Sequence, residues 1–352
     1  MRRMTANTGP LTATTLDAIG HTPLIELRRI PEGRGRILAK AEFLNPGGSK
    51  KDRIAAQIIR EAETEERLHP GQPVVELTSG NTGAGLALVC SATGHPFTAV
   101  MSRGNSGERA QMMRALGAEV VLIDQSLTSQ PGRVSGDDLD EVEHEAQRLC
   151  TERGAFRADQ FTLPGNYRAH YMGTALEIVS QAERFDAFCD FVGTGGSFAG
   201  CAKRFKEEDD TIGCYVVEPS SSPALAGLPI LDPRHRIQGG GYSRRHLPML
   251  DLASVVPDGY LTVTDEEAMG YARRLAREEG LFTGISSGAN VAAAMKLLDG
   301  PYAGGTVVVL LNDTGLKYLS TELCPRGEWL ALSSGPDLAR YPFVSDGSTA
   351  VA

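Results

Sequence analysis

The sequence predicts an α/β protein of two domains with twisted, parallel-rich sheets. Short apolar strands alternate with helical segments between about residue 37 and residue 311, and this alternation is typical of βαβ units with parallel strands. The length of 352 residues suggests about two domains, each large enough for a core of its own. Two turns rich in glycine and hydroxyl side chains, 78–83 and 193–197, each join an apolar strand to a helix. Ligands of such folds bind at these strand ends.

The predicted elements follow one another in an order that sets the domain boundaries. In the first part of the chain, strands at 74–77, 97–101 and 119–123 alternate with helices at 84–92, 106–116 and 138–153. Strands at 37–43, 188–192, 213–217 and 306–311 and helices at 198–205 and 265–280 form the rest. We expect a smaller domain at 45–163 and a larger one from 16–44 and 164–325, with a loose arm at 1–15 and a tail at 326–352.

Charge and composition exclude several classes of protein. The net charge of −9 argues against general binding to nucleic acid or to anionic membranes. No apolar run approaches the ~18 residues of a membrane span, and the first residues lack the apolar core of a secretory signal. The six cysteines show no CxxC spacing, so we expect reduced thiols and neither a disulfide framework nor a metal site. A cytoplasmic enzyme is the default expectation.

The segment 45–53 (Asn-Pro-Gly-Gly-Ser-Lys-Lys-Asp-Arg) places two lysines at the predicted start of a helix. Proline and glycine end an extended segment, and Ser49 is expected to cap the helix. Lys51 shares a face with the apolar positions three, four and seven residues later, so we expect it to point inward and Lys50 to face solvent. A buried lysine at a helix N-terminus has a lowered pKa, which suits Schiff-base chemistry. The alternative is a pair of ordinary surface lysines.

The turn 78–83 (Thr-Ser-Gly-Asn-Thr-Gly) is the first predicted anion site. It follows a buried strand and opens a helix of small residues, so free backbone N–H groups, the helix dipole and side-chain hydroxyls converge there. A plain connection would need fewer polar groups. We therefore expect this turn to bind a ligand.

The loop 193–197 (Gly-Thr-Gly-Gly-Ser) is the second predicted anion site, because its glycines let backbone N–H groups close on a phosphate. A dinucleotide is the alternative ligand, with Glu218 near the position of a ribose-binding acid. Phe198 stands where that fingerprint needs its last glycine, which disfavours an NAD-binding oxidoreductase. No Gly-Lys-Ser/Thr follows either loop, so the Walker pattern also fails.

Four motifs in order resemble the cysteine synthase and cystathionine β-synthase family, which uses pyridoxal 5′-phosphate (PLP) and has the tryptophan synthase β-like fold (PLP fold type II). The motifs are 45–53, 78–83, 193–197 and 284–288 (Gly-Ile-Ser-Ser-Gly), and the similarity covers about 16–323. The resemblance implies that the larger domain binds PLP and that the smaller domain is mobile and closes on the substrate. It also implies a homodimer that acts on small molecules, an amino acid and a nucleophile.

The resemblance further implies a role for each matching residue. Lys51, which directly precedes Asp-Arg, is the implied catalytic residue and the Schiff-base partner of PLP. The implied cofactor-binding set adds Asn81 at the phenolic oxygen, Gly193, Thr194, Gly195, Gly196 and Ser197 at the phosphate, and Ser286 at the ring nitrogen. The implied substrate-binding set is Thr78, Ser79, Thr82 and Gln160 at the α-carboxylate, with Gly240 and Tyr242 near the entry of the nucleophile.

The implied reaction is β-replacement on an activated L-serine. Cysteine synthase, which converts O-acetyl-L-serine and sulfide to L-cysteine and acetate, is the leading case. A serine at position 286 suits this reaction, because it does not enforce a protonated ring and leaves PLP a milder electron sink. The alternatives are a cystathionine β-synthase-like enzyme, another β-substituted alanine synthase that uses serine or O-phosphoserine, and a Ser/Thr dehydratase.

The chain also departs from the family pattern. Lys50 stands where an apolar residue is usual, and Ser197 where threonine is frequent. Asn312-Asp313 replaces the more common Pro-Ser or Pro-Asp after the last strand. The segment 239–242 (Gly-Gly-Gly-Tyr) is closer to cystathionine β-synthases than to many cysteine synthases, which leaves the choice of substrate open.

Overall fold

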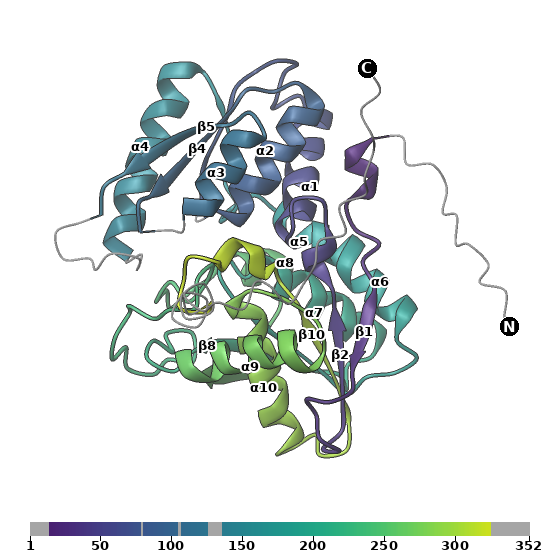
Figure 1. The fold of residues 1–352 in the computed structure, drawn as a ribbon. Coiled ribbons are helices and arrows are strands. Elements are labelled where there is room, and N and C mark those ends of the chain that lie inside the picture. Colours follow the sequence, from purple (N-terminus) through teal and green to yellow (C-terminus); the bar gives the residue numbers. More distant parts are fainter. Residues whose placement is uncertain (1–13, 79, 105–106, 126–135, 325–352) are drawn as a thin grey trace, which may run out of the picture.

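The computed structural model describes residues 14–78, 80–104, 107–125 and 136–324, which form two α/β units, each built on one sheet (Figure 1). The larger sheet has the strand order β1 (Leu24–Leu27), β2 (Arg36–Lys40), β10 (Thr306–Leu310), β7 (Ala187–Phe191), β8 (Gly213–Pro219), β9 (Gly259–Val263). The smaller sheet has the order β5 (Glu119–Ile123), β4 (Phe97–Ser102), β3 (Val74–Leu77), β6 (Phe156–Arg157). All neighbouring strands pair in parallel except β1 with β2. The predicted fold class is confirmed.

The helices follow the same division between the two units. The smaller sheet is accompanied by α1 (Lys51–Thr64), α2 (Asn81–Thr93), α3 (Gly107–Ala115) and α4 (Gly136–Arg153). The larger sheet is accompanied by α5 (Gly165–Ala169), α6 (Ala175–Gln181), α7 (Gly196–Glu208), α8 (Pro248–Ala253), α9 (Asp265–Glu278) and α10 (Ile285–Leu298). Single turns of helix lie at Thr15–Ala18, Glu42–Leu44 and Gly315–Tyr318, and a π-helix at His170–Thr174. The expected tail at 326–352, and the arm apart from residues 14 and 15, lie outside the described residues.

Helices cover both faces of the smaller sheet, because its strands point successive apolar side chains to opposite sides. Val74 and Ala99 pack with apolar residues of α1, α2 and α3. Val75 and Val100 pack on the other face, against α4. Figure 1 shows α4 on one side of β4 and β5, with α2 and α3 on the other. No helix in the described part of the chain is long and apolar enough to cross a bilayer.

The larger sheet is covered in the same way. Cys189 and Val307 pack with α9 and α10 on one face, and Phe188 and Val308 pack with α6, α7 and α8 on the other. Helix α10 is buried along almost its whole length. Its N-terminus is therefore fixed beside the carboxyl ends of the parallel strands, where ligands of α/β sheets bind.

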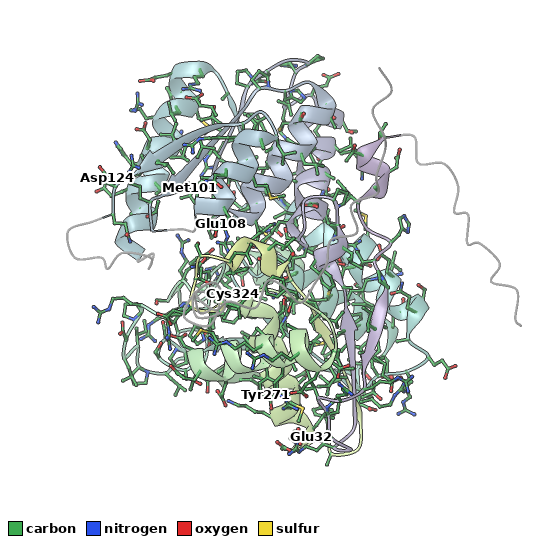
Figure 2. All side chains as sticks on the ribbon, in the orientation of Figure 1. Glu32, Met101, Glu108, Asp124, Tyr271 and Cys324 are labelled. Atoms are coloured by element: carbon green, nitrogen blue, oxygen red, sulfur yellow. The ribbon has the colours of Figure 1, made fainter. Side chains whose placement is uncertain are left out.

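Side chains of α3 join the smaller unit to the last described segment of the larger one. Glu108 Oε1 accepts the backbone N–H of Ser320 (2.9 Å), and Figure 2 places Glu108 between the two units. Arg109 is buried and donates to the hydroxyl oxygen of Tyr318 (2.7 Å), with its guanidinium over the Tyr318 ring. The two units thus share a polar boundary. Movement of one against the other stays a prediction.

Helix α1 begins at Lys51, one residue later than a cap at Ser49 predicts. Lys50 is the N-cap residue, and the Ser49 hydroxyl accepts the backbone N–H of Lys51 (3.2 Å). Helix α2 crosses closely because Gly85 has no side chain: a Cβ there would lie 2.9 Å from the carbonyl oxygen of Lys51. The first turns of α1 and α2 therefore lie side by side.

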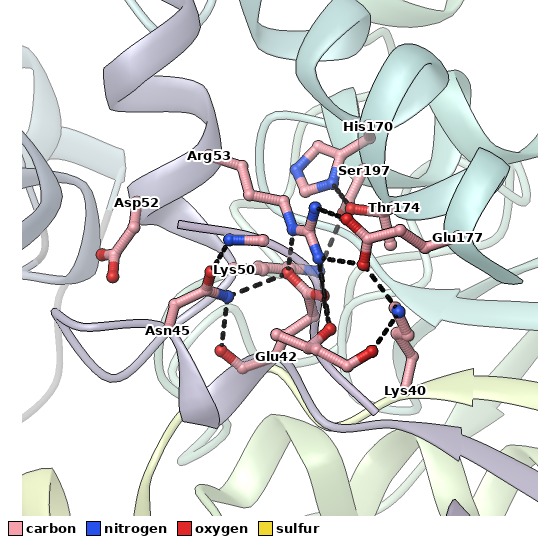
Figure 3. A network of polar contacts seen from close by, with 12 residues as sticks. Lys40, Glu42, Asn45, Lys50, Asp52, Arg53, His170, Thr174, Glu177 and Ser197 are labelled. Atoms are coloured by element: carbon pink, nitrogen blue, oxygen red, sulfur yellow. Dashed lines mark hydrogen bonds and ion pairs between the residues drawn. The ribbon is translucent and has the colours of Figure 1, made fainter. Parts of the chain in front are cut away.

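A buried ionic network fixes the start of α1 to the larger unit (Figure 3). Arg53 Nε and Nη2 each donate to Glu42 (2.7 Å), and Nη1 and Nη2 donate to Glu177 of α6 (2.6 and 2.8 Å). Lys40 Nζ, at the end of β2, lies 2.7 Å from the Glu177 carboxylate. Burial raises the pKa of Glu177, but hydrogen bonds from Arg53 and Lys40 outweigh it and hold that pKa at about 2.

Glu177→Gln is expected to destabilise the protein by about 3 kcal/mol near pH 7, because the buried Arg53 and Lys40 lose a shared, partly buried anion. The folded pKa of about 2 lies below the unfolded value. This stability is therefore complete above about pH 4.3 and is lost as the pH falls toward the folded pKa. Urea unfolding of both proteins across this range should show the difference shrinking in acid.

The matched control for this change is Glu278→Gln, which breaks an i,i+4 pair with Arg274 on the surface of α9. Its cost should stay below about 1 kcal/mol. An equal cost for the two substitutions would contradict the structural role assigned to Glu177.

Candidate active site

A cavity lies where the N-termini of α1, α2, α7 and α10 meet the carboxyl ends of β7 and β10. The residues that line it are Lys50, Lys51, Asn81, Phe191, Gly193, Thr194, Gly195, Ser197, Gln238, Gly239, Ser286 and Asn312. Seven of the predicted cofactor-binding residues are among them: Lys51, Asn81, Gly193, Thr194, Gly195, Ser197 and Ser286. Gly196 belongs to the same loop but is not part of the cavity wall. Each of the four sequence motifs thus contributes at least one residue to the cavity wall.

Lys51 points into this cavity, as helical periodicity predicts. Burial and, to a smaller extent, the charge of Lys50 lower its pKa, the Asp190 carboxylate opposes both, and the resulting pKa is about 7. Among the residues that the structure describes, no acceptor or carboxylate is paired with the Lys51 amine. A large fraction of this amine is therefore neutral and nucleophilic near pH 7, unlike an ordinary lysine.

Lys50 does not face solvent, and the sequence prediction for it is wrong. It is only 7% exposed. Its ammonium donates to both carboxylate oxygens of Asp190 on β7 (3.0 and 2.9 Å) and to the hydroxyl oxygen of Ser197 (2.8 Å). The prediction failed because Lys50 precedes the helix, so the helical face of later residues does not set its direction.

The loop 193–197 leads into α7, whose first backbone N–H groups have no acceptor within the helix. Asn166 packs directly against this loop: a Cβ at Gly196 would lie 2.0 Å from Asn166 Oδ1. The Asn166 amide also donates to Thr194 Oγ1 (2.9 Å) and to the carbonyl oxygen of Gln160 (2.6 Å). A free N-terminus at a cavity wall, with backbone at close range, is suited to hold an anion.

Ser286 and two amides form the opposite wall. Asn312 Nδ2 donates to Ser286 Oγ (3.1 Å), which leaves the serine O–H free to donate into the cavity. Within the described residues, neither Gln238 Oε1 nor Asn312 Oδ1 receives a hydrogen bond, although both are buried. Buried acceptors without a donor are uncommon in folded proteins, and these two belong to residues that line the cavity.

Asn81 is held by a charged pair at the start of α2. Its amide donates to Asp313 Oδ2 (2.7 Å), and its carbonyl oxygen accepts from Lys317 Nζ (2.9 Å). Lys317 also donates to the backbone carbonyl of Gly47 (2.8 Å), and burial lowers its pKa to about 8. One N–H of the Asn81 amide remains for a ligand. Asp313 and Lys317 are positioning residues that the sequence analysis did not identify.

Of the described residues of the turn 78–83, Asn81 lines the cavity and the others lie outside its wall. Thr78 Oγ1 accepts the backbone N–H groups of Gly80 (3.0 Å) and Gly83 (2.8 Å), which fixes the turn. Thr82 donates to Gln160 Oε1 (2.6 Å), so these two predicted substrate-binding residues are in contact. Ser79 lies outside the described residues. The role of this turn toward a substrate carboxylate stays a prediction.

The segment 239–242 packs against the loop after β7. A Cβ at Gly240 would lie 2.5 Å from the carbonyl oxygen of Val192. Tyr242 lies beside Phe161, with ring centroids 6.1 Å apart. Neither Gly240 nor Tyr242 is part of the cavity wall, whereas the neighbouring Gly239 is. Their predicted contact with the nucleophile is untested.

Glu218, the residue of the dinucleotide alternative, is engaged in the fold. Its carboxylate accepts the backbone N–H groups of Leu225 (2.8 Å) and Ala226 (2.9 Å), and the side chain is buried. This carboxylate holds the loop after β8. The observed contacts therefore give no support to a ribose-binding role.

Comparison with known proteins places the chain among related sequences and structures. A family model described as pyridoxal-phosphate dependent enzyme matches residues 15–313. A cysteine synthase of Staphylococcus aureus is 39% identical over 309 residues, covering 87% of this chain and 94% of that protein. An O-ureido-L-serine synthase of Streptomyces lavendulae is 37% identical over 316 residues, covering 89% and 93%. The crystal structure of a hydrogen sulfide-producing enzyme from Fusobacterium nucleatum matches with a TM-score of 0.79 and 38% identity, covering 88% and 100%.

Lys51→Met is expected to stabilise the ligand-free protein near pH 7, because it removes an amine whose folded pKa, about 7, lies below the unfolded value. Between the folded pKa and about pH 10.4 the unfolded chain binds more protons, so the wild type gains about 1.4 kcal/mol per pH unit at most. The advantage of Lys51→Met should therefore fade as the pH rises. Urea unfolding at several pH values tests this, and a constant difference between the proteins would contradict the lowered pKa.

Proposed function

Because the chain belongs to the pyridoxal-phosphate-dependent enzymes, we propose that it catalyses β-replacement on an activated L-serine, converting O-acetyl-L-serine and sulfide to L-cysteine and acetate. One observation carries the proposal. A lysine amine with a lowered pKa, the N-terminus of α7 and the Ser286 hydroxyl all meet in a single cavity. The similarity to a cysteine synthase over most of both chains supports the choice of reaction.

The residues present fit PLP at this cavity. The N–H groups of Gly193 to Ser197 at the start of α7 would hold the phosphate, and a side chain at Gly196 would collide with Asn166. Lys51 would bind the aldehyde carbon, Asn81 the phenolic oxygen and Ser286 the ring nitrogen. When bound, PLP supplies an electron sink for the bonds at the substrate Cα.

Lys51 is proposed to act as the general base and acid at the substrate Cα. Its neutral Nζ takes the proton and later returns it, and a pKa of about 7 favours both directions near neutral pH. The Ser286 hydroxyl, oriented by Asn312, would donate a hydrogen bond without transferring a proton to the ring. This arrangement suits elimination and replacement at Cβ better than reactions that need a stronger electron sink.

Thr78, Ser79, Thr82 and Gln160 are proposed to hold the substrate α-carboxylate. The contact between Thr82 and Gln160 supports a shared site, and Asn166 connects Gln160 to Thr194 of the phosphate loop. The proposal also includes closure of residues 45–163 over the substrate and entry of the nucleophile past Gly240 and Tyr242. It further includes a homodimer and a cytoplasmic location. Exposed Met172 and Leu176, 48% and 37% accessible, offer apolar surface to a second copy.

The test is a substrate panel on purified protein with PLP. The donors are O-acetyl-L-serine, O-phosphoserine, L-serine and L-cysteine, each with sulfide or homocysteine. We expect the highest kcat/KM for O-acetyl-L-serine with sulfide, and a loss of at least about a thousandfold in Lys51→Ala. A preference for serine with homocysteine would indicate a cystathionine-type synthase instead. Release of a keto acid and ammonia would indicate a dehydratase, and sulfide release from L-cysteine a desulfhydrase.

Thr82→Val is expected to raise KM for the amino-acid donor about 10- to 100-fold, because a charge-assisted hydrogen bond and the position of Gln160 are both lost. PLP content should not change, since the phosphate is held by a different loop. Titration with donor, followed by the visible absorption of the cofactor, measures the first quantity. Loss of PLP with unchanged donor affinity would mean that the two anion sites are exchanged.

A further inference from the structure

The buried ion pair between Lys50 and Asp190 lies directly beneath the proposed phosphate loop. Lys50 Nζ is 2.8 Å from Ser197 Oγ, and Ser197 is the last residue of that loop. The Ser197 hydroxyl in turn donates to Asp190 Oδ2. The three side chains form a closed polar cluster between the start of α1, β7 and the start of α7 (Figure 3 shows Lys50 and Ser197).

The two residues of the ion pair differ in their position relative to the cavity. Lys50 and Ser197 line the cavity, whereas Asp190 does not line it and is fully buried behind them. Asn290 of α10, which does not line the cavity either, also donates to Asp190 Oδ1 (3.0 Å). The positive end of the pair therefore faces the ligand and the negative end faces the core.

We propose that Lys50 is a phosphate-positioning residue, whose ammonium, held in place by Asp190, supplies the positive charge for the PLP phosphate. The proposal rests on the proposed function, because it needs PLP in this cavity with its phosphate at residues 193–197. Backbone N–H groups and a helix dipole supply only about half a unit charge to a dianion. Lys50 adds a full charge at the same place.

Asp190 has a distinct part in this arrangement. An ammonium is costly to bury without an acceptor beside it. The Asp190 carboxylate supplies that acceptor and holds the Lys50 side chain in place in the ligand-free protein. Since the Ser197 hydroxyl is occupied by Lys50 and Asp190, the loop serine contributes its backbone N–H to the phosphate and its side chain to the ion pair.

The experiment compares the dissociation constants of PLP and of pyridoxal, which lacks the phosphate, for the apoenzyme. Equilibrium dialysis measures both in the wild type, Lys50→Met, Asp190→Asn and the double variant. The ratio of the two constants isolates the phosphate contact, because a general distortion of the cavity would weaken both ligands alike.

Lys50→Met and Asp190→Asn are expected to change this ratio in opposite directions. Lys50→Met should lower the preference for PLP about 10- to 100-fold, since it removes the cation and leaves the Asp190 anion behind the phosphate. Asp190→Asn should raise the preference, because Lys50 then has the phosphate as its single anionic partner. The double variant should fall between the wild type and Lys50→Met. It also provides a neutral replacement of the pair if Lys50→Met does not fold.

Lys40→Met is the matched control, because Lys40 is another buried lysine in an ion pair, with Glu177, away from the cavity. It should lower stability and leave the ratio unchanged. An unchanged ratio in both Lys50→Met and the double variant, or a fall in Asp190→Asn, would overturn the role of Lys50. A wild type that does not prefer PLP to pyridoxal would instead overturn the proposed function.

Discussion

Four consecutive charged residues at one helix start are buried or, for Lys51, partly buried, and neighbouring groups compensate most of their charges. Arg53 has two carboxylates, Asp52 accepts the backbone N–H of Gly47, and Lys50 has Asp190. Within the described residues, Lys51 alone of the four has no such partner for its side chain. Burial without compensation favours the neutral form of an amine. The reactivity of the site therefore depends on the missing partner: the charged residues next to Lys51 are paired, whereas the Lys51 amine is not paired with any described residue.

The partners of these charges come from distant parts of the chain, so the site exists only when both units are folded. Glu42 follows β2, Glu177 lies on α6 and Asp190 lies on β7. Gly85 and Asn81 bring α2 of the smaller unit against the same point. The parallel strands of the larger sheet place the starts of α7 and α10 at one edge, which brings the anion-binding loop and Ser286 within one cavity. Stability and function are thus built on the same contacts.

Much of this arrangement was predictable because it depends on local patterns. Alternating strands and helices predict the fold class, and periodicity within α1 turns Lys51 inward. Lys50 was predicted wrongly because its direction is set by a partner 140 residues away, which no local pattern contains. One signal was available: Asp190 is a charge inside the fully buried strand β7, and such a charge requires a partner. Asn166 and Gln238 gave no comparable signal, since their roles come from packing against the loop and the cavity.

Lys50 and Lys51 are adjacent in the chain, but their side chains have different electrostatic surroundings. Both amines are buried near each other, and the ammonium of Lys50 itself disfavours a second charge on Lys51. The Asp190 carboxylate contacts the Lys50 amine directly, whereas among the described residues no hydrogen bond or ion pair joins it to the Lys51 amine. An apolar residue at position 50 would leave Lys51 neutral through burial alone, but it would bring no cation to the phosphate loop. The ion pair therefore adds a charge for anion binding at one position while preserving a neutral nucleophile at the next.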